Sequence, residues 1–472
     1  MLTEKRYPGA LTDENITKIF AGAGDFIRRE LRCGAFVLYA YAIDGLTSGG
    51  DTSDYVIKPI TEQLHGADMG ELYQRALAGE VYNSVANDCP DLDTVALKLV
   101  NGFCVVLFPG AGAIAFEVKT GEKRGISAPE VENTVKGAKD AFVETVRSNT
   151  SLIRRHLRAP ELRFYETKVG SQSLTNVSVV YLEGVTDPKL VQRMKKRLVD
   201  IKTDGIVLPS AVEELVSGSR ATPFPLLQYT ERTDRFCHSI LEGRVGLIVD
   251  GIPLGYLLPV DVGAMMNSAE DYSRGYLAAS AVRILRYLAL VIDLLVPALY
   301  VAMTVCHWDL MPPGLAQVIR QGRSNVPFSP IWETLGLLVA FELLQESGIQ
   351  LPQSIGQTVS IIGGIVVGTA GVEAGLISSV ALIAVSMAGV CGFVLPNRDF
   401  ADAIRLWRFV LAVLASCAGF YGMAIGMVIL GIHLVKLRSL GVSYLKMFEP
   451  SVIRKRAKTE KRKKSKKDEK SA

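Results

Sequence analysis

Hydrophobic and polar positions divide the 472-residue chain into two parts. Up to about residue 284, short apolar runs alternate with polar turns, as in a water-soluble fold of strands and helices. Beyond that point long apolar runs dominate: Tyr287–Trp308 holds one acid and no base, Gln357–Pro396 holds one charge, and Phe409–Leu434 holds none. A soluble helix keeps a polar face, so these runs indicate helices that cross a lipid bilayer.

The first part predicts two α/β (α+β) lobes. After an N-terminal segment, residues 1–21, the mixed strand and helix patterns of residues 22–158 predict a first subdomain. Within it, Asn101-Gly102 separates two β-rich runs and is the strongest hairpin signal in the chain. Apolar residues at near-helical spacing predict one long connecting helix over Pro129–Arg158.

A second small subdomain is predicted for residues 159–225. Two strand patterns, ELRFYETKVG and VSVVYLEGV, precede a basic amphipathic helix, LVQRMKKRLVDI. Residues 209–225 predict either a linker or a short helix. Residues 226–284 form a hairpin and juxtamembrane region, in which Asp250-Gly251 separates two apolar runs.

Residues 285–440 predict a helical membrane domain with about four crossings, six being the next choice. Residues 357–396 suit either two short crossings with a turn near 371–375 or one long broken crossing. The shorter run 331–345 holds two acids, so an interfacial or re-entrant helix competes there with a true span.

Composition and charge refine this picture. The chain is 49% hydrophobic, and its mean hydropathy of +0.25 excludes a disordered protein. The net charge is +4, but residues 451–472 hold eleven Lys or Arg against three acids, a net of +8. Residues 441–472 therefore predict a disordered basic tail, either solvated or lying on anionic lipid. A basic block confined to a tail argues against nucleic-acid binding.

Orientation follows from the basic residues beside the last apolar run. Lys436, Arg438 and the tail place the C-terminus in the cytoplasm. The first twenty residues contain no apolar core of a secretory signal, so we expect the N-terminal half there too. Both termini inside require an even number of crossings.

Catalytic and metal-binding patterns are absent from the sequence. No phosphate-binding loop, zinc-protease motif or nucleophile elbow occurs, the five histidines are scattered, and the seven cysteines include no C-x-x-C pair. We expect neither an enzyme nor a metal or cofactor site.

Acids inside apolar runs are the main candidates for function, since a charge in hydrocarbon costs about 2.5 to 3.5 kcal/mol and usually faces water or a partner. Asp293, Glu342 and Glu373 qualify. Asp293 lies two turns from Arg286 and is expected to form an interfacial salt bridge with it. Glu373 either lines a hydrated path or gate, or sits at a turn between two short helices.

Small residues four apart let membrane helices approach closely. The glycine-rich run around Glu373 contains two such pairs, which serve either packing within the chain or self-association around a pore: Gly364 with Gly368, and Gly371 with Gly375.

From about Pro129 to Phe448 the chain resembles the A subunit of GerA-type spore germination receptors. The matching segments, in order, are NTSLIRRHLRAPEL, PFPLLQYTERTDR, ILEGRVGLIVDGIP, NSAEDYSRGY, RYLAL, PALYVA, ELLQESGIQLPQSIGQTVSIIGGIVVGTAGVEAGLISS and HLVKLRSLGVSYL. Thr233 stands where the family usually has proline.

The resemblance implies a multi-pass protein of the spore inner membrane with a cytoplasmic N-terminal region. It implies a transporter-like B subunit and a lipoprotein C subunit as partners, and self-association into a ligand-gated cation channel that triggers germination. A non-conducting scaffold that clusters germination proteins, or a sporulation paralogue of the A subunit, is the alternative. By matching position it also implies a hinge that couples the soluble and membrane parts through five residues: Glu231, Arg232, Glu242, Arg244 and Asp250.

Overall fold

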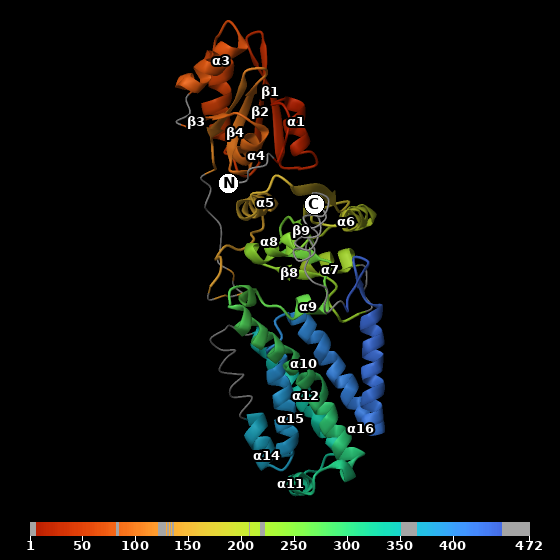
Figure 1. The fold of residues 1–472 in the computed structure, drawn as a ribbon. Coiled ribbons are helices and arrows are strands. Elements are labelled where there is room, and N and C mark those ends of the chain that lie inside the picture. The colour runs from red at the N-terminus through yellow and green to blue at the C-terminus, as the bar shows by residue number, and fades with distance from the viewer. Residues whose placement is uncertain are drawn as a thin grey trace, which may run out of the picture. The chain divides into compact units, whose positions relative to one another are not determined.

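The computed structural model describes residues 6–81, 85–120, 129, 132, 134, 136–206, 208–217, 222–350 and 366–445. These residues form two compact units (Figure 1). Unit 1 holds the described residues up to 217 together with Leu227–Pro259, and unit 2 holds residues 222–226 and 260–445. The predicted α/β region and the predicted helical region are both confirmed.

The first sheet of unit 1 is antiparallel, in the order β1-β2-β4-β5-β3. Its central strand β4 is buried throughout, and its side chains alternate between two cores: Val105 packs with α1 and α4 on one face, and Val106 packs with the helical segment from α2 to η3 on the other. The elements are β1 (Phe26–Cys33), β2 (Phe36–Ile43), β3 (Ala86–Cys89), β4 (Phe103–Phe108), β5 (Gly112–Glu117), α1 (Asp13–Ile19), α2 (Gly49–Thr52), η1 (Ser53–Ile57), η2 (Pro59–Gln63), α3 (Met69–Arg75), η3 (Ala76–Glu80) and α4 (Leu92–Val100).

The hairpin predicted at Asn101-Gly102 is wrong. The run before it forms the helix α4, whose N-terminus is capped by the Asp91 carboxylate accepting from the Thr94 N–H at 2.9 Å. Gly102, with φ of +83°, lies in the turn between the end of that helix and β4. The apolar residues of α4 lie at a spacing that places them on one helical face. The hairpin prediction rested instead on the β-branched residues of this run, and the helical spacing was the better guide.

A second antiparallel sheet in unit 1 has the order β6-β7-β9-β10-β8 and runs across the boundary predicted at residue 225. Helices α5 and α8 share a core with it, and α6 lies against β7 and β9. The predicted strands and helix of residues 159–225 are present, and α7 is the short helix that competed with a linker. The elements are β6 (Leu162–Val169), β7 (Thr175–Leu182), β8 (Gln228–Thr230), β9 (Val245–Val249), β10 (Gly255–Leu258), α5 (Val146–His156), α6 (Pro188–Asp200), α7 (Pro209–Ser217) and α8 (Thr233–Leu241).

The long helix predicted over Pro129–Arg158 is also wrong, because α5 begins only at Val146. Before it the chain is extended: the Phe142 N–H donates to the Glu231 carbonyl at 2.8 Å. The Asp250 carboxylate accepts from the Val146 N–H at 3.0 Å and so satisfies an amide at the start of the helix. This start depends on a residue 104 positions away, which local spacing does not reveal.

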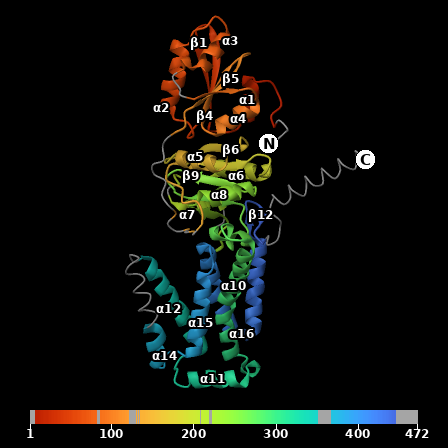
Figure 2. The same ribbon diagram turned by 60° about the vertical axis from the view of Figure 1, so that its left-hand side comes forward.

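Unit 2 is helical. Its principal elements are α10 (Tyr276–Val305), α11 (Pro313–Arg323), α12 (Pro330–Gln350), α15 (Ser379–Phe393) and α16 (Arg398–Lys436), and its short ones are α9 (Val262–Met265), η4 (Ala269–Tyr272), η5 (Trp308–Leu310), η6 (Val366–Ala370), α14 (Gly371–Glu373), β11 (Arg438–Ser439) and β12 (Val442–Ser443). Helix α10 packs most extensively on α16 and α15, and α12 makes fewer contacts with these three (Figure 2).

The long element α16 is a helical hairpin. Its backbone breaks at Ala418 and Gly419, where Gly419 has φ of +59° and ψ of −133°. The two arms then pack side by side: a Cβ added to Gly422 would lie 1.9 Å from the Leu414 carbonyl oxygen. Phe400 and His433, near the two ends, both lie with ring centroids 5.9 Å from Phe224. The break therefore lies inside the uncharged run 409–434, which the sequence indicates as the last membrane helix.

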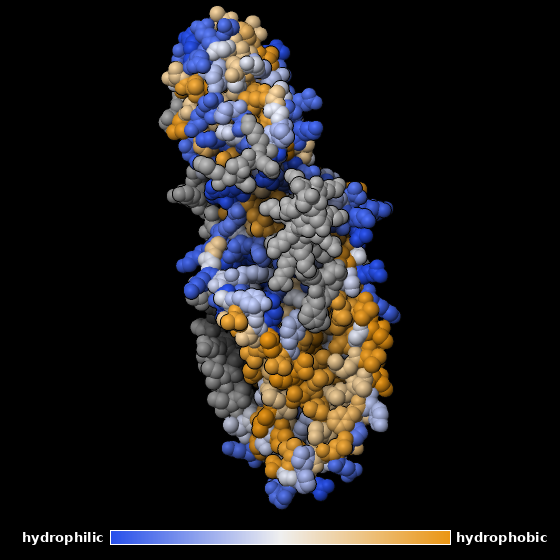
Figure 3. Space-filling model, in the orientation of Figure 1, coloured by the Kyte–Doolittle hydropathy of each residue, from blue (hydrophilic) through white to orange (hydrophobic). Residues whose placement is uncertain are grey.

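Apolar side chains cover much of the surface of unit 2 (Figure 3), including Ile383, Val390, Val413, Tyr421 and Val428. Two described helices are long and apolar enough to cross a membrane, α10 and α16, and α15 is a shorter apolar helix. The arms of α16, residues 398–417 and 420–436, measure about 30 Å and 26 Å at about 1.5 Å per residue. The number of crossings stays a prediction.

Candidate functional site

Three ionisable side chains from three helices meet inside unit 2. Arg408 of α16 donates from Nη1 to Asp293 Oδ1 of α10 at 2.6 Å and from Nη2 to Glu342 Oε1 of α12 at 2.7 Å. Asp293 and Arg408 are fully buried, whereas the Glu342 side chain is 29% exposed. One cation thus joins two acids that are 49 positions apart in the chain.

A fourth helix completes the surroundings of this cluster. Gly392 of α15 faces Asp293, and a Cβ added there would lie 3.2 Å from Asp293 Oδ2. A glycine at this position therefore lets α15 approach the carboxylate. Arg405, one turn before Arg408, lies 3.9 Å from Glu342 Oε2.

The charges of the cluster are only partly satisfied. Among the described residues, Asp293 Oδ2 and Arg408 Nε have no hydrogen-bond partner. Removing an ion pair from water costs several kcal/mol per ion, about what its attraction returns, so such a pair contributes little net stability by itself. A buried acid with an open oxygen suits a role in function better than a role in stability alone.

The salt bridge predicted between Asp293 and Arg286 is wrong. Arg286 instead pairs with Asp271, donating from Nη2 to Oδ1 at 2.9 Å and from Nη1 to the Met266 carbonyl at 3.1 Å. Asp271 belongs to a capping box with Ser268 that fixes η4 beside the first turns of α10. Arg286 and Asp293 are seven residues apart, yet each has a buried partner from another element.

A second buried acid, Glu333 of α12, anchors three further elements. It pairs with Arg323 of α11 and accepts from the Ser378 N–H, at the start of α15, at 2.5 Å. Arg323 also donates to the Tyr300 hydroxyl of α10 at 3.3 Å. The first turn of α12 is thus fixed, while its second half holds Glu342.

The remaining membrane candidates lie apart from this cluster. Glu373 is exposed in the short helix α14, and Gly375 follows it with φ of +67°, so a turn does occur where one was expected. A Cβ on Gly371 would lie 2.8 Å from Ile377 of the same chain, and one on Gly368 would lie 3.7 Å from Leu382. Gly364 lies outside the described residues.

The five predicted hinge residues all lie around the second sheet of unit 1. Arg232 is buried; it forms a two-bond ion pair with Asp234, at 3.1 and 2.6 Å, and donates to the Ala138 carbonyl at 2.9 Å. The Glu231 carboxylate accepts from the Glu132 N–H at 2.5 Å. These two residues tie the extended segment before α5 to the start of α8.

The other three hinge candidates make separate local contacts. Asp250 caps α5, Glu242 lies 3.9 Å from Arg244, and Arg244 donates to Gln228 at 3.3 Å. The coupling role stays a prediction.

Thr233, at the position where the resembled family has proline, is buried and contacts a charged pair. Its hydroxyl donates to Asp140 Oδ2 at 2.7 Å, and His156 Nε2 lies 2.6 Å from that same oxygen. Burial alone would raise the pKa of Asp140, but the hydrogen bonds from His156 and Thr233 outweigh it and lower the pKa to about 2. The hydrogen bond to Asp140 raises the pKa of His156, and Asp234 adds to this effect.

Arg408 and Glu333 were missed as site residues in the sequence. Arg408 immediately precedes an uncharged run, where a basic residue suggests only the membrane boundary. The sequence did offer one signal: acids at 293 and 342 lie within apolar runs and need a cation to neutralise them, and few cations occur in the apolar region. No group of three or more His, Cys, Asp or Glu that could hold a metal occurs in the described part of the chain.

An α/β unit followed by an apolar helical unit with buried ion pairs defines a membrane protein with a large polar N-terminal region. The family model described as "Bacillus/Clostridium GerA spore germination protein" matches residues 14–471. The chain belongs to this family of spore germination proteins.

Three relatives from Bacillus subtilis (strain 168) illustrate the similarity. The chain is 35% identical to the uncharacterized membrane protein YfkQ over 93% of this chain and 85% of that protein. It is 32% identical to spore germination protein KA over 92% and 80%, and 35% identical to spore germination protein A1 over 76% and 76%. The N-terminal domain of the A subunit of the Bacillus megaterium germinant receptor GerK3 is 23% identical, with a TM-score of 0.41, over 52% of this chain and 91% of that domain.

Proposed function

We propose that this protein is the A subunit of a spore germinant receptor in the spore inner membrane, working with a transporter-like B subunit and a lipoprotein C subunit. Membership of the GerA family and the apolar surface of unit 2 support this role. Both ends of the α16 hairpin carry basic residues, Arg398 and Arg405 on one arm and Lys436 on the other. This distribution supports a topology with both termini on the core side, by the positive-inside rule.

Within that complex, copies of the chain assemble around a cation path that opens when the germinant is recognised. The observation that carries this proposal is the sharing of Arg408 between a fully buried acid and a partly exposed one. Asp293 can neutralise Arg408 alone, so Glu342 can leave without stranding a buried cation. Arg408 and Glu342 then form a latch that holds the second half of α12 against α10 and α16 when the path is closed.

Two acidic side chains can then line the path for cations. Glu342 becomes free to face water once α12 moves, and the exposed Glu373 lies at a turn of unit 2. Rings of acidic side chains contributed by several copies select cations over anions. The glycines around Glu373, Gly368 and Gly371 among them, allow close packing of neighbouring helices.

A non-conducting relative of the A subunit is the second candidate function. The chain is as similar to YfkQ, an uncharacterized membrane protein, as to spore germination protein A1. Under this alternative the protein clusters germination proteins in the membrane and passes no ions.

Potassium flux from liposomes that contain the protein with its B and C partners separates the two. The channel proposal expects germinant-dependent flux, and Glu342→Gln is expected to raise the resting leak several-fold because the latch is weakened. Glu373→Gln is expected to lower the preference for cations while the resting leak stays unchanged. Arg274→Gln, which breaks an exposed ion pair with Glu270, is the control and should match wild type. Silent liposomes with a correctly assembled complex would favour the scaffold.

A further inference from the structure

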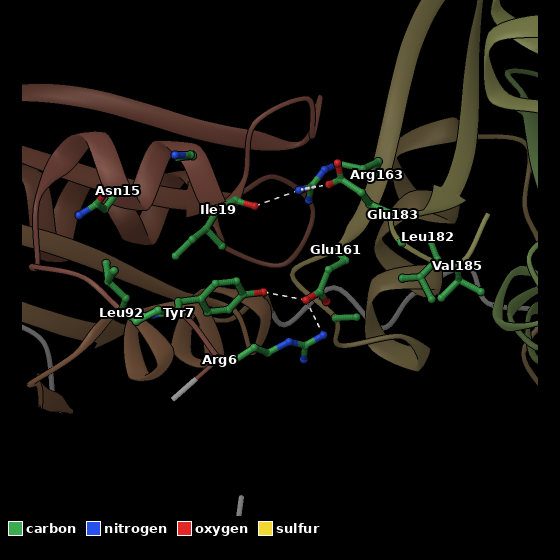
Figure 4. Close-up of a pocket in the computed structure, with 14 residues that line it drawn as sticks. Arg6, Tyr7, Asn15, Ile19, Leu92, Glu161, Arg163, Leu182, Glu183 and Val185 are labelled. Atoms are coloured by element: carbon green, nitrogen blue, oxygen red, sulfur yellow. Dashed lines mark hydrogen bonds and ion pairs between the residues drawn. The ribbon is translucent and has the colours of Figure 1, made fainter. Parts of the chain in front are cut away.

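The exposed surfaces of the two units differ in chemistry. Unit 1 has a cavity of about 570 Å³ between its two sheets, and polar and charged side chains at its walls pair with one another (Figure 4). The Tyr7 hydroxyl donates to Glu161 at 2.8 Å, and Glu183 lies 2.6 Å from Arg163. Water is a suitable neighbour for such side chains. The exposed surface of unit 2 is largely apolar and requires a different neighbour (Figure 3).

Helix α11 has an apolar face that is wider than the protein surface on which it packs. At about 100° per residue, Leu315, Val318 and Ile319 fall on one side of this helix. Gln317 and Arg320 fall on the opposite side. Ile319 is buried, whereas Leu315 and Val318 are 44% and 55% exposed. Part of the apolar face of α11 therefore extends beyond the surface that the described residues cover.

Polar contacts hold α11 against the other helices of unit 2. Arg323, in its last turn, pairs with the buried Glu333 of α12 and donates to the Phe328 carbonyl at 2.9 Å. The eleven residues of α11 span about 16 Å, roughly half of a hydrocarbon core of about 30 Å. The helix is therefore too short to cross a bilayer, and its orientation is fixed.

Two of the three tryptophans in the chain flank α11. Trp308 precedes it, and the Arg320 guanidinium lies over the indole ring at 5.4 Å from the centroid. Trp332, at the start of α12, follows it and is 69% exposed. Tryptophan is enriched where a membrane meets water, because its large apolar ring carries one polar N–H. This end of unit 2 thus has the composition of a membrane boundary.

An apolar stripe begins at Trp332 and runs along α12. Trp332, Val339 and Leu343 are all exposed, and their spacings of seven and four residues place them on one face of the helix. The stripe covers eleven residues, or about 16 Å along the helix axis. A stripe of this kind suits contact with lipid, and its first residue lies beside α11 in the chain.

We propose that α11 lies in the plane of the membrane surface, at the level of the lipid headgroups. Leu315 and Val318 contact the acyl chains of the lipid, Gln317 faces water, and Arg320 lies among the headgroups. Interfacial amphipathic helices bury their apolar face about 5 to 10 Å into this boundary. The partner of this surface is the lipid of the surrounding membrane.

This arrangement connects the lipid surface to the candidate site. Glu333 holds α11 through Arg323, and it holds the start of α15 through the Ser378 N–H at 2.5 Å. It also precedes Glu342 by nine residues, about 13 Å along α12. A change in the depth of α11 therefore displaces α12 and Glu342 with it. The inference rests on the placement of unit 2 in a membrane and does not depend on conduction.

The depth of single tryptophans in a bilayer tests the proposal. The full-length protein is placed in vesicles of phosphatidylcholine and phosphatidylglycerol, without its partners. Phenylalanine replaces the three native tryptophans, and one tryptophan is then introduced as Leu315→Trp, Gln317→Trp or Val428→Trp. Position 428 is exposed in the second arm of α16. Fluorescence is quenched with iodide in the water, or with lipids brominated near the headgroup or near the end of the acyl chain.

The expected result differs between the two faces of α11. The lipid brominated near the headgroup should quench Leu315→Trp at least about twofold more than the lipid brominated deeper, because the helix lies at the boundary. Iodide should be the main quencher of Gln317→Trp. The deeper bromines should quench Val428→Trp most. A variant that keeps only the native Trp332 needs no introduced tryptophan and should behave like Leu315→Trp.

The outcomes separate this proposal from the membrane placement of unit 2. Equal quenching of Leu315→Trp and Gln317→Trp by iodide, with Val428→Trp still quenched by lipid, overturns the proposal for α11 alone. Protection of Leu315→Trp from both iodide and lipid would assign the face to a second copy of the chain and would also overturn it. A Val428→Trp that neither lipid quenches would contradict the membrane placement and the proposal together.

Discussion

The guanidinium of Arg408 lies 2.6 Å from the carboxylate of Asp293, although 115 positions separate them in the chain. Both side chains are inaccessible to solvent. The contact joins α10 to the first arm of α16, and these two helices pack on each other more extensively than any other pair in unit 2. Because Glu342 binds the same guanidinium, one residue determines the electrostatic balance of three helices.

Replacing Arg408 by Met should destabilise unit 2 by about 3–5 kcal/mol, because a buried carboxylate is left without a counter-ion. Thermal melting of the purified protein in detergent measures this loss. The double variant Arg408→Met with Asp293→Leu should recover most of it, since both members of the buried pair are then removed. Arg274→Gln, which loses an exposed ion pair with Glu270 elsewhere in unit 2, should cost less than about 1 kcal/mol. If the double variant melts no higher than Arg408→Met alone, the unpaired Asp293 carboxylate is not the cause of the lost stability.

Gly419→Ala should cost about 3 kcal/mol or more, from a backbone conformation that only glycine adopts readily and from crowding. The added Cβ would lie 2.2 Å from His307. Gly431→Ala is the matched control in the second arm of α16: nothing lies within 4 Å of its added Cβ, and a gain of about 0.5–1 kcal/mol is expected. Equal effects of the two changes on thermal melting in detergent would argue against a break at Gly419.

Arg154→Lys should lower the stability of unit 1 by about 3 kcal/mol, since lysine cannot form both bonds to the buried Asp25. Arg28→Lys provides a control of the same geometry in an exposed place, because Arg28 also binds Asp13 through two bonds of 2.7 Å. Its expected cost is below about 1 kcal/mol. Urea unfolding followed by far-ultraviolet circular dichroism measures the free energy of unfolding of the two variants. A similar decrease in both would show that burial does not strengthen the ion pair of Arg154.

The pair of His156 and Asp140 should make the stability of unit 1 depend on pH. The pKa of His156 is raised in the folded protein, so its contribution is complete below its ordinary pKa of 6.5 and is lost as the pH rises through the raised value. The pKa of Asp140 is lowered to about 2, so its contribution is present above 3.8 and is lost as the pH falls toward 2. The pair therefore stabilises most between about pH 4 and 6.5.

The measurement is the melting temperature of wild type and His156→Gln from pH 5 to 9. The advantage of wild type should be largest at the acidic end of this range and should shrink by a few degrees at the alkaline end. His238→Gln, at an exposed histidine near Glu242, is the control and should show a difference that does not vary in this way. A constant difference for His156→Gln would exclude a charged histidine in the pair.

Sequence patterns predicted the elements whose signal is local. The strands β6 and β7, the basic helix α6 and the hairpin at Asp250-Gly251 follow from alternation, helical spacing and turn residues within about ten positions of each other. The errors arose where a distant residue decides the outcome. Helix α5 starts at Val146 because Asp250 accepts its N–H, and no spacing near Pro129 contains that information.

The candidate site was predicted in part for the same reason. Asp293 and Glu342 are conspicuous because acids are rare in apolar runs, and the structure brings them together. Arg408 was not predicted as a site residue, because a basic residue next to an apolar run usually marks the membrane boundary. Arg286 was preferred as the partner of Asp293 because it is near in sequence, but Asp271 binds it.

The break at Ala418 and Gly419 also bears on how the protein is made. A two-residue connection leaves no hydrophilic loop between the arms of α16, so neither arm can be threaded into the bilayer and released by the insertion machinery before the other. We expect both arms to enter as one preformed hairpin. The tip then offers no site for a protease or an epitope tag, and topology mapping of this region has to rely on positions near Arg398 and Lys436.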